Sequence, residues 1–305
     1  MNDKLKWVHK HDGDGIVLPW SQAKFKNLKF SIHENGRIQI TGSLHKFWNN
    51  GDHNYNDFNV ANLKKCIEDL QDMFDINPYT ARLSNLEYGV NLVVPFQVSN
   101  FIKSIFCYRF KGFNLSNNGS FFGKYLDMAH YKIKIYDKGK QFHRSENILR
   151  IEKCIKKMEI LSSEPLYLVD LLNPKIQRKC FDQILKVFDN ILFNETLKIN
   201  ALTVPEKKNY ELVANESCRW LLFDKSKSVV ANVKKRSETK RKYIDIISKY
   251  GREQYRPLIV LLMVNKFISL TKNGDISTVS KEDKKGDIST YLIHQPNVPL
   301  YAALY

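Results

Sequence analysis

The clearest alternation of apolar and polar residues lies between residues 130 and 138 and predicts a β-strand. Ile133 and Ile135 share one face of that strand, because successive side chains point to opposite faces. The polar face carries Lys132, Lys134, Tyr136 and Lys138. The pattern therefore predicts a strand that buries an aliphatic row and exposes a row of lysines around one tyrosine.

Two further segments alternate in the same way, and each places a glutamate on its polar face. The first is a strand expected at residues 83–94, which exposes Glu87. The second is expected at residues 147–157, where Glu152 shares the polar face with Arg150. Adjacent strands lie roughly 4.8 Å apart in a sheet. If the three strands are neighbours, both carboxylates converge beside the tyrosine of the first strand.

The remaining patterns complete an α+β chain. Asn35-Gly36 is a strong turn signal and predicts a hairpin over residues 28–43. Apolar residues at helical spacing predict a helix from Val60 to Phe74, with Asn59 or Asp57 as its N-cap. Between the strands expected at 83–94 and 130–138, we expect a short helix at 99–106, a loop at 114–119 and a strand at 121–126.

Beyond about residue 160 the periodicity becomes helical, with helices expected at 181–192, 238–250 and 257–270. We therefore expect an α+β domain over residues 1–160 and a mainly helical C-terminal domain with a polar tail over residues 161–305. The tail contains the sequence Gly-Asp-Ile-Ser-Thr twice, at 274–278 and 286–290. We interpret this repeat as part of a flexible loop or tail.

Charge adds a class of partner to this picture. The chain has 48 Lys and Arg against 32 Asp and Glu, a net charge of +16. Such a surplus favours a polyanionic partner, because each neutralised phosphate releases counterions. The alternative interpretation is a lysine-rich surface without a specific partner.

Cysteine use and hydropathy bear on the compartment. The five cysteines contain no CxxC pair, which disfavours a zinc site or a disulfide framework and favours a reducing cytoplasm. The N-terminus has no apolar core typical of a signal peptide. The longest apolar run, Leu258 to Val264, is too short to span a bilayer. We expect a cytoplasmic protein that makes no use of a membrane.

The three polar faces together suggest phosphoryl chemistry. Tyr136 could attack phosphorus and form a phosphotyrosyl intermediate, and Lys138 could lower the phenol pKa or stabilise the pentavalent phosphorus. Glu87 and Glu152 are the hard oxygen ligands that Mg²⁺ or Mn²⁺ prefers. Arg150 could hold a flanking phosphate. The alternative is that the glutamates are solvated surface residues and that residues 137–140 form only a polar turn.

Other basic residues are candidates for DNA contacts. Lys46 and Trp48 lie in an expected loop at residues 44–50, where aromatic and basic side chains could stack on and hold single-stranded bases. A surface loop with a buried tryptophan is the alternative. The other candidates are Lys132, Lys134 and Lys140 near the tyrosine, and Lys234, Lys235, Arg236, Lys240 and Arg241 in a basic run suited to duplex DNA or simply to a solvated helix face.

In this order and spacing, the motifs resemble those of the filamentous-phage gene II type of rolling-circle replication initiator and, more distantly, plasmid Rep nickases. The resemblance rests on four segments: TGSLHKFWNNGDHNYNDFNVANLKKCIEDL (41–70), ARLSNLEYGVNLVV (81–94), KIKIYDKGKQ (132–141) and NILRIEKCIKKM (147–158). The C-terminal half has no matching motif.

The resemblance implies an antiparallel nucleotidyl-transferase sheet related to the HUH endonucleases, flanked by helices. It implies that Tyr136, followed by Lys138, nicks origin DNA and becomes linked to a 5′-phosphate, with Glu87 and Glu152 as metal-binding carboxylates. Three departures from the family pattern are visible. Asn85 stands where the family has an arginine, Glu87 stands where it has an aspartate, and no His-hydrophobic-His pair is present.

The expected function is therefore initiation of rolling-circle replication by a metal-dependent nicking and joining endonuclease of a phage or plasmid-like element. Its expected partners are origin DNA, a host helicase that meets the helical half, and a second subunit. A hydroxyl, a second subunit or a second nucleophile, for which Tyr131 is a candidate, would close the cycle. The alternative is a non-catalytic protein that binds single-stranded nucleic acid on the same sheet, with Tyr136 stacking on bases.

Overall fold

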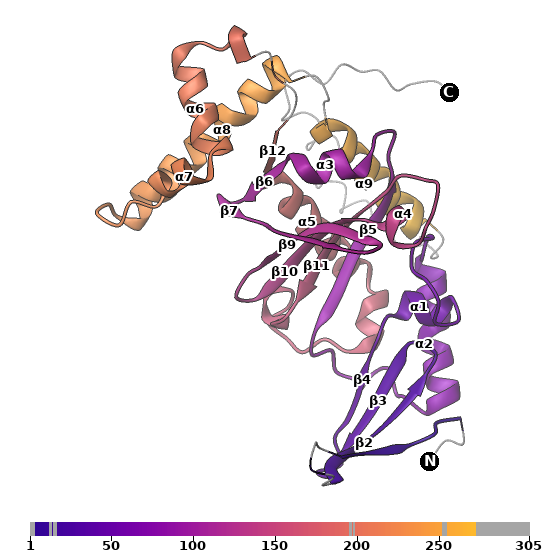
Figure 1. Ribbon diagram of the computed structural model, residues 1–305. Coiled ribbons are helices and arrows are strands. Elements are labelled where there is room, and N and C mark those ends of the chain that lie inside the picture. Colours follow the sequence, from indigo (N-terminus) through magenta and orange to yellow (C-terminus); the bar gives the residue numbers. More distant parts are fainter. Residues whose placement is uncertain are drawn as a thin grey trace, which may run out of the picture.

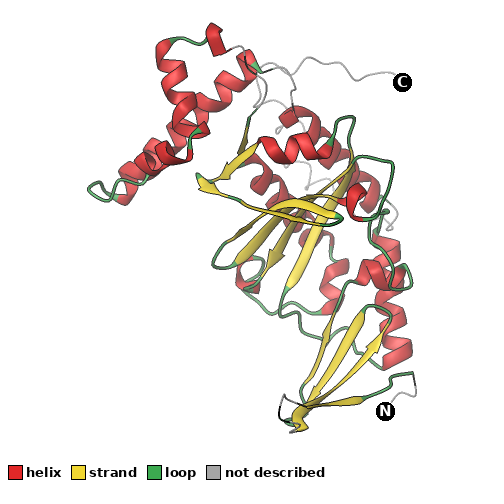
Figure 2. Ribbon diagram, in the orientation of Figure 1, coloured by secondary structure: helices red, strands yellow, loops and turns green. Residues whose placement is uncertain are grey.

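The structure is a computed structural model of the 305-residue chain, and it describes residues 4–11, 14, 17–194, 197, 199–251 and 255–272. The chain is α+β, and the strand pairs in the described residues are antiparallel. Figure 2 shows a lower sheet, a central sheet and an upper group of helices. The expected fold class, α+β with antiparallel sheets, is confirmed at this level.

The N-terminal part is a four-stranded sheet covered by two helices (Figure 1). Its elements are β1 (Val8–His11), β2 (Val17–Phe25), β3 (Leu28–His33), β4 (Ile38–Thr41), α1 (Leu44–Trp48) and α2 (Val60–Phe74). The predicted hairpin is β3 and β4, and its turn places Gly36 at φ +76°, where glycine carries no Cβ strain. The predicted helix is α2, and the Asn59 side chain caps it.

The expected loop at residues 44–50 is a short helix instead, so that prediction is wrong. The Ser43 side chain accepts a hydrogen bond from the Lys46 backbone and starts α1. Phe47 is then buried among the apolar side chains of β2, β3 and α2, and this burial stabilises one helical turn that the local sequence alone does not favour.

The central sheet has five strands in the order β5-β11-β10-β9-β8. They are β5 (Leu86–Val93), β11 (Ile148–Ile155), β10 (Tyr131–Asp137), β9 (Phe121–Asp127) and β8 (Asn114–Asn118). The expected neighbourhood of the three polar strands is confirmed, with β11 in the middle. The loop expected at residues 114–119 is wrong, because β8 pairs with β9 as an edge strand whose side chains are mostly exposed.

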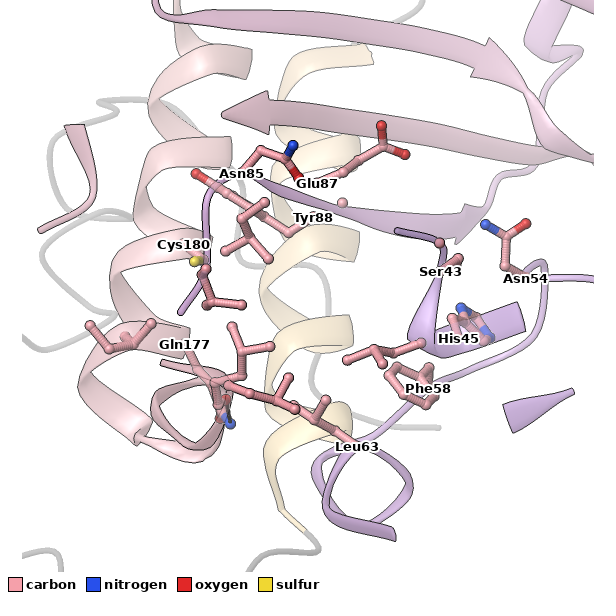
Figure 3. A pocket seen from close by; sticks show the side chains of 18 of the residues that line it. Ser43, His45, Asn54, Phe58, Leu63, Asn85, Glu87, Tyr88, Gln177 and Cys180 are labelled. Carbon is pink, nitrogen blue, oxygen red and sulfur yellow. Dashed lines mark hydrogen bonds between the residues drawn. The ribbon is translucent and has the colours of Figure 1, made fainter. Parts of the chain in front are cut away.

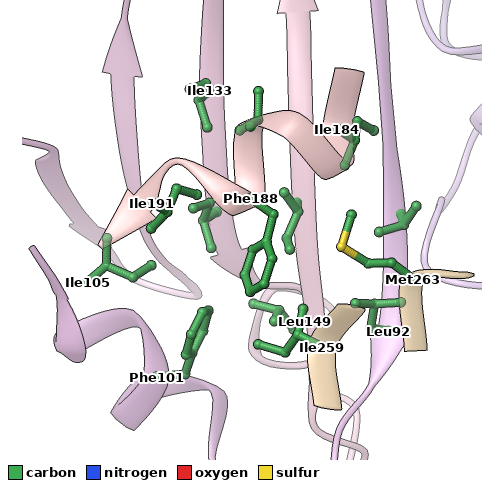
Figure 4. Close-up of a cluster of buried hydrophobic side chains, with 14 of the residues drawn as sticks. Leu92, Phe101, Ile105, Ile133, Leu149, Ile184, Phe188, Ile191, Ile259 and Met263 are labelled. Carbon is green, nitrogen blue, oxygen red and sulfur yellow. The ribbon is translucent and has the colours of Figure 1, made fainter. Parts of the chain in front are cut away.

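Helices α3 (Val98–Ser104), α5 (Pro174–Asp189) and α9 (Tyr255–Thr271) cover the aliphatic face of this sheet. Figure 4 shows the Phe188 side chain of α5 in one buried cluster with Leu149 of the sheet and Ile259 of α9. A small sheet, β12 (Ile191–Phe193), β6 (Ile105–Tyr108) and β7 (Lys111–Gly112), adjoins this core. The helix expected at 99–106 therefore ends at Ser104, because β6 pairs with β12.

This packing crosses residue 160, the expected domain boundary, because α5 and α9 belong to the core of the central sheet. Helices α6 (Val204–Ala214), α7 (Glu216–Arg219) and α8 (Val229–Tyr250) instead form an arm that projects away from the sheet in Figure 1. The short elements are α4 (Lys138–Gln141), η1 (Met158–Ile160), η2 (Leu168–Leu172), η3 (Ile199–Ala201) and η4 (Trp220–Leu222).

The Gly-Asp-Ile-Ser-Thr repeat lies outside the described residues. Within the described ranges, no helix combines the length and the apolar character needed to cross a bilayer.

A candidate active site on the polar face of the central sheet

Strand register brings the predicted residues onto one face of three neighbouring strands. Lys134 of β10 is the direct partner of Glu152 on β11, and Tyr136 is the partner of Arg150. On the other side of β11, Glu87 of β5 is the partner of Cys154, which lies two residues beyond Glu152 on the same face. The structure thus unites Tyr136, Lys138, Glu152, Arg150, Lys134 and Glu87, which we call the tyrosine cluster.

The Tyr136 phenol lies between a carboxylate and an amine. Its oxygen donates a hydrogen bond to Glu152 Oε1 at 2.9 Å and accepts one from Lys138 Nζ at 3.3 Å. Tyr136 is only 5% exposed and Glu152 only 1%. The expectation of an exposed polar row is therefore wrong for these residues, because other parts of the chain cover this face of the sheet.

Two glycines make the space that these buried side chains occupy. A Cβ on Gly89 would lie 2.8 Å from Glu152 Cγ, closer than carbon atoms approach. A Cβ on Gly123 of β9 would overlap the Cβ of Tyr136. A side chain at either position would push the glutamate or the tyrosine out of line, so the glycines fix the geometry of the phenol and its carboxylate partner.

Glu152 is ionised in spite of its burial. Burial alone would raise its pKa, but the charges of Arg150 and Lys134 outweigh that effect and lower the pKa of Glu152 to about 2. Burial and the Glu152 charge both raise the pKa of Tyr136 above its ordinary value. In the resting site the phenol therefore keeps its proton and the carboxylate accepts its hydrogen bond.

Lys138 differs from a surface lysine in its burial and in its pKa. It is 2% exposed, and its ammonium group contacts Gln141 Oε1 at 3.0 Å and the Phe142 ring at 4.8 Å. Burial, followed by repulsion from Arg150, lowers the pKa of Lys138 to about 7. A neutral amine therefore lies beside the phenol in a large fraction of molecules near neutral pH, and this is the protonation state that a base requires.

A segment of the N-terminal part covers the cluster. Asn91 of β5 accepts a hydrogen bond from Arg150 at 2.8 Å and donates to the carbonyl groups of Asn54 and Tyr55, each at 3.0 Å. The Tyr55 ring lies 5.3 Å from the Phe142 ring, which in turn contacts Lys138. Residues 54–55 are thus linked to Arg150 through Asn91, and to Lys138 through the Tyr55 and Phe142 rings.

Glu87 and Glu152 converge, but on an ammonium group. Lys134 Nζ lies 2.6 Å from Glu87 Oε2 and 3.3 Å from Glu152 Oε2. Glu87 Oε2 also accepts a hydrogen bond from Cys154 Sγ at 2.8 Å. Among the described residues, no group of three or more His, Cys, Asp or Glu side chains could hold a metal ion. With Lys134 between them, the carboxylates do not fit the Mg²⁺ or Mn²⁺ site expected at Glu87 and Glu152.

A groove of about 1730 Å³ runs between the N-terminal part and the central sheet, and Glu87 and Arg150 are the members of the tyrosine cluster that line it. Figure 3 shows Glu87 and Tyr88 of β5 on one wall, His45 and Phe58 on the second, and Gln177 of α5 on the third. The polar lining is made of amides, cations and a few carboxylates. The amides are Gln39, Asn54, Asn56, Asn59, Asn85, Asn91 and Gln177, the cations are Arg37, Arg82, Arg150, Lys156, Lys157 and Lys266, and the carboxylates are Asp57, Glu87 and Glu159.

The other residues predicted to contact DNA lie in two parts of the structure. Lys46 lies over the Phe142 ring and Lys132 over the Tyr125 ring, so both are near the tyrosine cluster, and Lys140 is exposed at the end of β10. Trp48 is 38% exposed. The basic run lies on α8 in the arm, away from the cluster (Figure 1).

Some side chains of that basic run are bonded to other parts of the chain. Lys235 and Arg236 donate to the carbonyl groups of Leu221 and Leu222, and Lys240 pairs with Asp189 at 2.6 Å. Lys234 and Arg241 are exposed. Tyr131, the candidate second nucleophile, shares the opposite face of β10 with Ile133, and its hydroxyl bonds to that of Tyr108 at 3.0 Å, so it does not join the tyrosine cluster.

Sequence reasoning missed three residues of the site. Asn91 was on the polar face of the same strand as Glu87, and that position was the available signal. Gly123 interrupts an otherwise aromatic strand, which often marks a close approach of another chain segment. Phe142 gives no local signal, because its contact with Lys138 depends on the turn through α4.

A scan against protein-family models finds no match, and searches of curated proteins and of solved structures find none either.

Proposed function

We propose that this chain is a DNA nicking and joining enzyme that initiates rolling-circle replication, with Tyr136 as its nucleophile. One observation carries the proposal: the phenol of Tyr136 lies in hydrogen-bond contact with an ionised carboxylate, Glu152, and with Lys138, whose pKa lies near 7. A phenol, an orienting carboxylate and a near-neutral amine are the components of an activated nucleophile.

The proposed step moves one proton and exchanges one bond. The phenol donates its hydrogen bond to Glu152 in the resting site, and for the reaction its O–H turns to neutral Lys138. Lys138 removes the proton, and the Tyr136 oxygen forms a bond to phosphorus. The bond from phosphorus to the 3′-oxygen breaks, and Lys138 returns the proton to that oxygen. The products are a 5′-phosphotyrosine link and a free 3′-hydroxyl, which primes synthesis. Attack by a later 3′-hydroxyl on the phosphotyrosine reverses the step and joins the strand.

The rate of this step should depend on pH through Lys138. Because the base is the neutral amine and its pKa is about 7, we expect adduct formation to rise with pH through about 7 and to level off above it. Lys138→Met should slow the step by about 10²–10⁴-fold and remove this inflection. Single-turnover rates between pH 5.5 and 9 measure both effects.

Lys140→Met is the matched control, because Lys140 is exposed two residues further along the chain. It should keep the inflection near pH 7. An unchanged inflection in Lys138→Met would exclude Lys138 as the base.

The groove supplies a path for a single DNA strand to the cluster. Its volume exceeds that of typical small-molecule pockets, which are roughly 300–1,000 Å³, and it is open along an edge of each of two sheets, at β4 and β5. Cations and amides suit a phosphate backbone, and Phe58 with its stacked His45 ring suits bases. Since Tyr136 is buried, the strand must also displace the cover near Tyr55 before attack.

Removing groove cations should weaken single-strand binding. Arg82 and Lys157 are exposed residues of the groove lining. The Arg82→Ala, Lys157→Ala double variant should lose about tenfold in affinity and reduce the salt dependence of binding by about two ion equivalents. Fluorescence anisotropy with a labelled single-stranded oligonucleotide at several salt concentrations measures both values.

The matched control replaces Lys64 and Lys111, which are exposed but lie outside the groove lining. Their double alanine variant has the same net charge. Equal losses in both double variants would show that only overall charge matters and that the strand does not use the groove.

The wider setting of the proposal follows from the sheet and from the charge of the chain. An antiparallel sheet that carries a tyrosine and two carboxylates on adjacent strands supports a relationship to HUH-type nucleotidyl transferases. The exposed cations of α8, Lys234 and Arg241, support contact of the arm with duplex DNA at the origin. A host helicase and a second subunit remain the proposed protein partners, and the cytoplasm the proposed location.

The direct test uses a randomised single-stranded DNA library, since it requires no known origin sequence. The chain is incubated with the labelled library and resolved on a denaturing gel. A labelled band at the mass of protein plus DNA supports the nicking enzyme. Binding without any covalent band would contradict it and favour the alternative function, a single-strand-binding protein that uses the sheet as a platform.

A further inference from the structure

The cation between Glu87 and Glu152 is part of the chain itself. Lys134 is the direct strand partner of Glu152, so its side chain leaves β10 toward the gap between β11 and β5. Its Nζ contacts a carboxylate oxygen of each glutamate, at 2.6 Å from Glu87 and 3.3 Å from Glu152. Two carboxylates that converge on one point resemble half of a divalent-metal site, but that point is occupied by an ammonium group.

The carboxylate of Glu152 depends on that ammonium group. Its Oε1 atom already accepts hydrogen bonds from Tyr136 and Arg150. Its Oε2 atom is buried and has no hydrogen-bond donor in the described structure, so the Lys134 charge at 3.3 Å is what compensates it. Both carboxylates lie within ion-pair distance of Lys134 Nζ, and two adjacent negative charges favour the charged form of the amine.

Charge balance also opposes a metal ion at this position. Two carboxylates, Glu87 and Glu152, face two permanent cations, Lys134 and Arg150, and Lys138 adds positive charge whenever it is protonated. The cluster is thus neutral or positive before any metal arrives. A divalent ion would have to displace Lys134 from both carboxylates, and repulsion from Arg150 would remain.

We propose that the ammonium group of Lys134 is the resident cation of the tyrosine cluster, in the position where a related site would hold Mg²⁺ or Mn²⁺, and that it keeps divalent metals out. One consequence rests on the proposed function: Tyr136 would form its DNA link without added metal, with Lys134 and Arg150 offsetting the charge that develops on the phosphoryl oxygens. The occupancy of the position does not rest on that function.

The test measures Mn²⁺ binding by the full chain with electron paramagnetic resonance, in which free Mn²⁺ gives the signal. The wild-type chain should bind no Mn²⁺ that depends on Glu87. Lys134→Met, which keeps the length of the side chain and removes its charge, should bind one Mn²⁺ with an affinity at least about a hundredfold above any that the wild type shows. Adding Glu87→Gln to that variant should abolish the binding.

Lys132→Met is the matched control, because Lys132 lies on the same face of β10 but pairs with Asp127 at 3.4 Å. It should behave as the wild type does. Wild-type binding of Mn²⁺ that is lost in Glu87→Gln would overturn the proposal. Failure of folded Lys134→Met to bind Mn²⁺ would overturn it as well.

Lys134→Met removes an ion-pair partner from both Glu87 and Glu152, so its thermal unfolding is followed with and without Mn²⁺. A rise in melting temperature with Mn²⁺ in this variant, and none in the wild type, supports the proposal, whereas no rise in either contradicts it. These measurements need no DNA. An absence of covalent adduct would therefore overturn the proposed function while the assignment of Lys134 stands or falls by Mn²⁺ binding alone.

Discussion

Tyr136→Phe is expected to reduce the covalent protein–DNA adduct by about 10³-fold or more, because it removes the oxygen that forms the bond to phosphorus. The phenol is buried, but the variant should still fold. Only its hydrogen bonds with Glu152 and Lys138 are lost, which together costs about 2–3 kcal/mol. Adduct formation is measured on a denaturing gel, and folding is checked by thermal unfolding.

Tyr125→Phe is the matched control for this loss. Tyr125 lies on the neighbouring strand β9 opposite Lys134, and its ring contacts Lys132. Its hydroxyl has no role in the proposed step, so the adduct should form at the wild-type rate. Equal adduct formation by Tyr136→Phe and the wild type would remove Tyr136 from the mechanism.

Glu152→Gln is expected to lower the free energy of unfolding by about 3–5 kcal/mol, the largest effect on stability that the structure predicts. The carboxylate is 1% exposed and pairs with the buried side chain of Arg150. A neutral amide would leave that guanidinium group without its counter-charge in a poorly solvated position. Urea unfolding at pH 7 measures the change.

The loss of stability in Glu152→Gln should depend on pH. The pKa of Glu152 is lowered to about 2 in the folded chain, so its contribution to stability is complete above its ordinary pKa near 4.5. That contribution is lost as the pH falls from there towards 2. The stability difference between wild type and Glu152→Gln should therefore shrink below about pH 4.5.

Glu87→Gln provides the comparison, because the Glu87 side chain is 45% exposed and its ion pair with Lys134 is partly solvated. Such pairs contribute about 0–1 kcal/mol. Similar losses of stability in the two variants would show that Glu152 and Arg150 do not form the buried pair described here.

The alternation of apolar and polar residues predicted the central strands and their polar faces well. Alternation on a strand depends only on local geometry, and Ile133, Ile135 and Ile151 have no exposed surface. The neighbourhood of Glu87, Tyr136 and Glu152 followed from the assumption that the three strands pair, which the register confirms.

Burial of the tyrosine cluster could not be predicted in the same way. The cover near Tyr55 is far from Tyr136 in the sequence, and it is placed by hydrogen bonds from Asn91 to backbone carbonyl groups, which leave no trace in side-chain pattern. The short strands β6 and β12 escaped prediction for a related reason. Each is a run of three or four mostly buried residues, too short to show the strand period, and the two strands pair with each other.

Lys134 illustrates what local pattern leaves open. From its position on a polar strand face, Lys134 is expected to contact a phosphate. The strand register instead places it between two carboxylates. Its role depends on three strands at once.

Mass spectrometry of the DNA-linked peptide tests most directly whether Tyr136 is the nucleophile that becomes linked to DNA. The adduct formed with single-stranded DNA is digested with nuclease and protease, and the peptide that retains a nucleotide is sequenced by fragmentation. We expect a nucleotide 5′-phosphate on Tyr136. A nucleotide on any other residue, or an adduct that carries a 3′-phosphate, would contradict it.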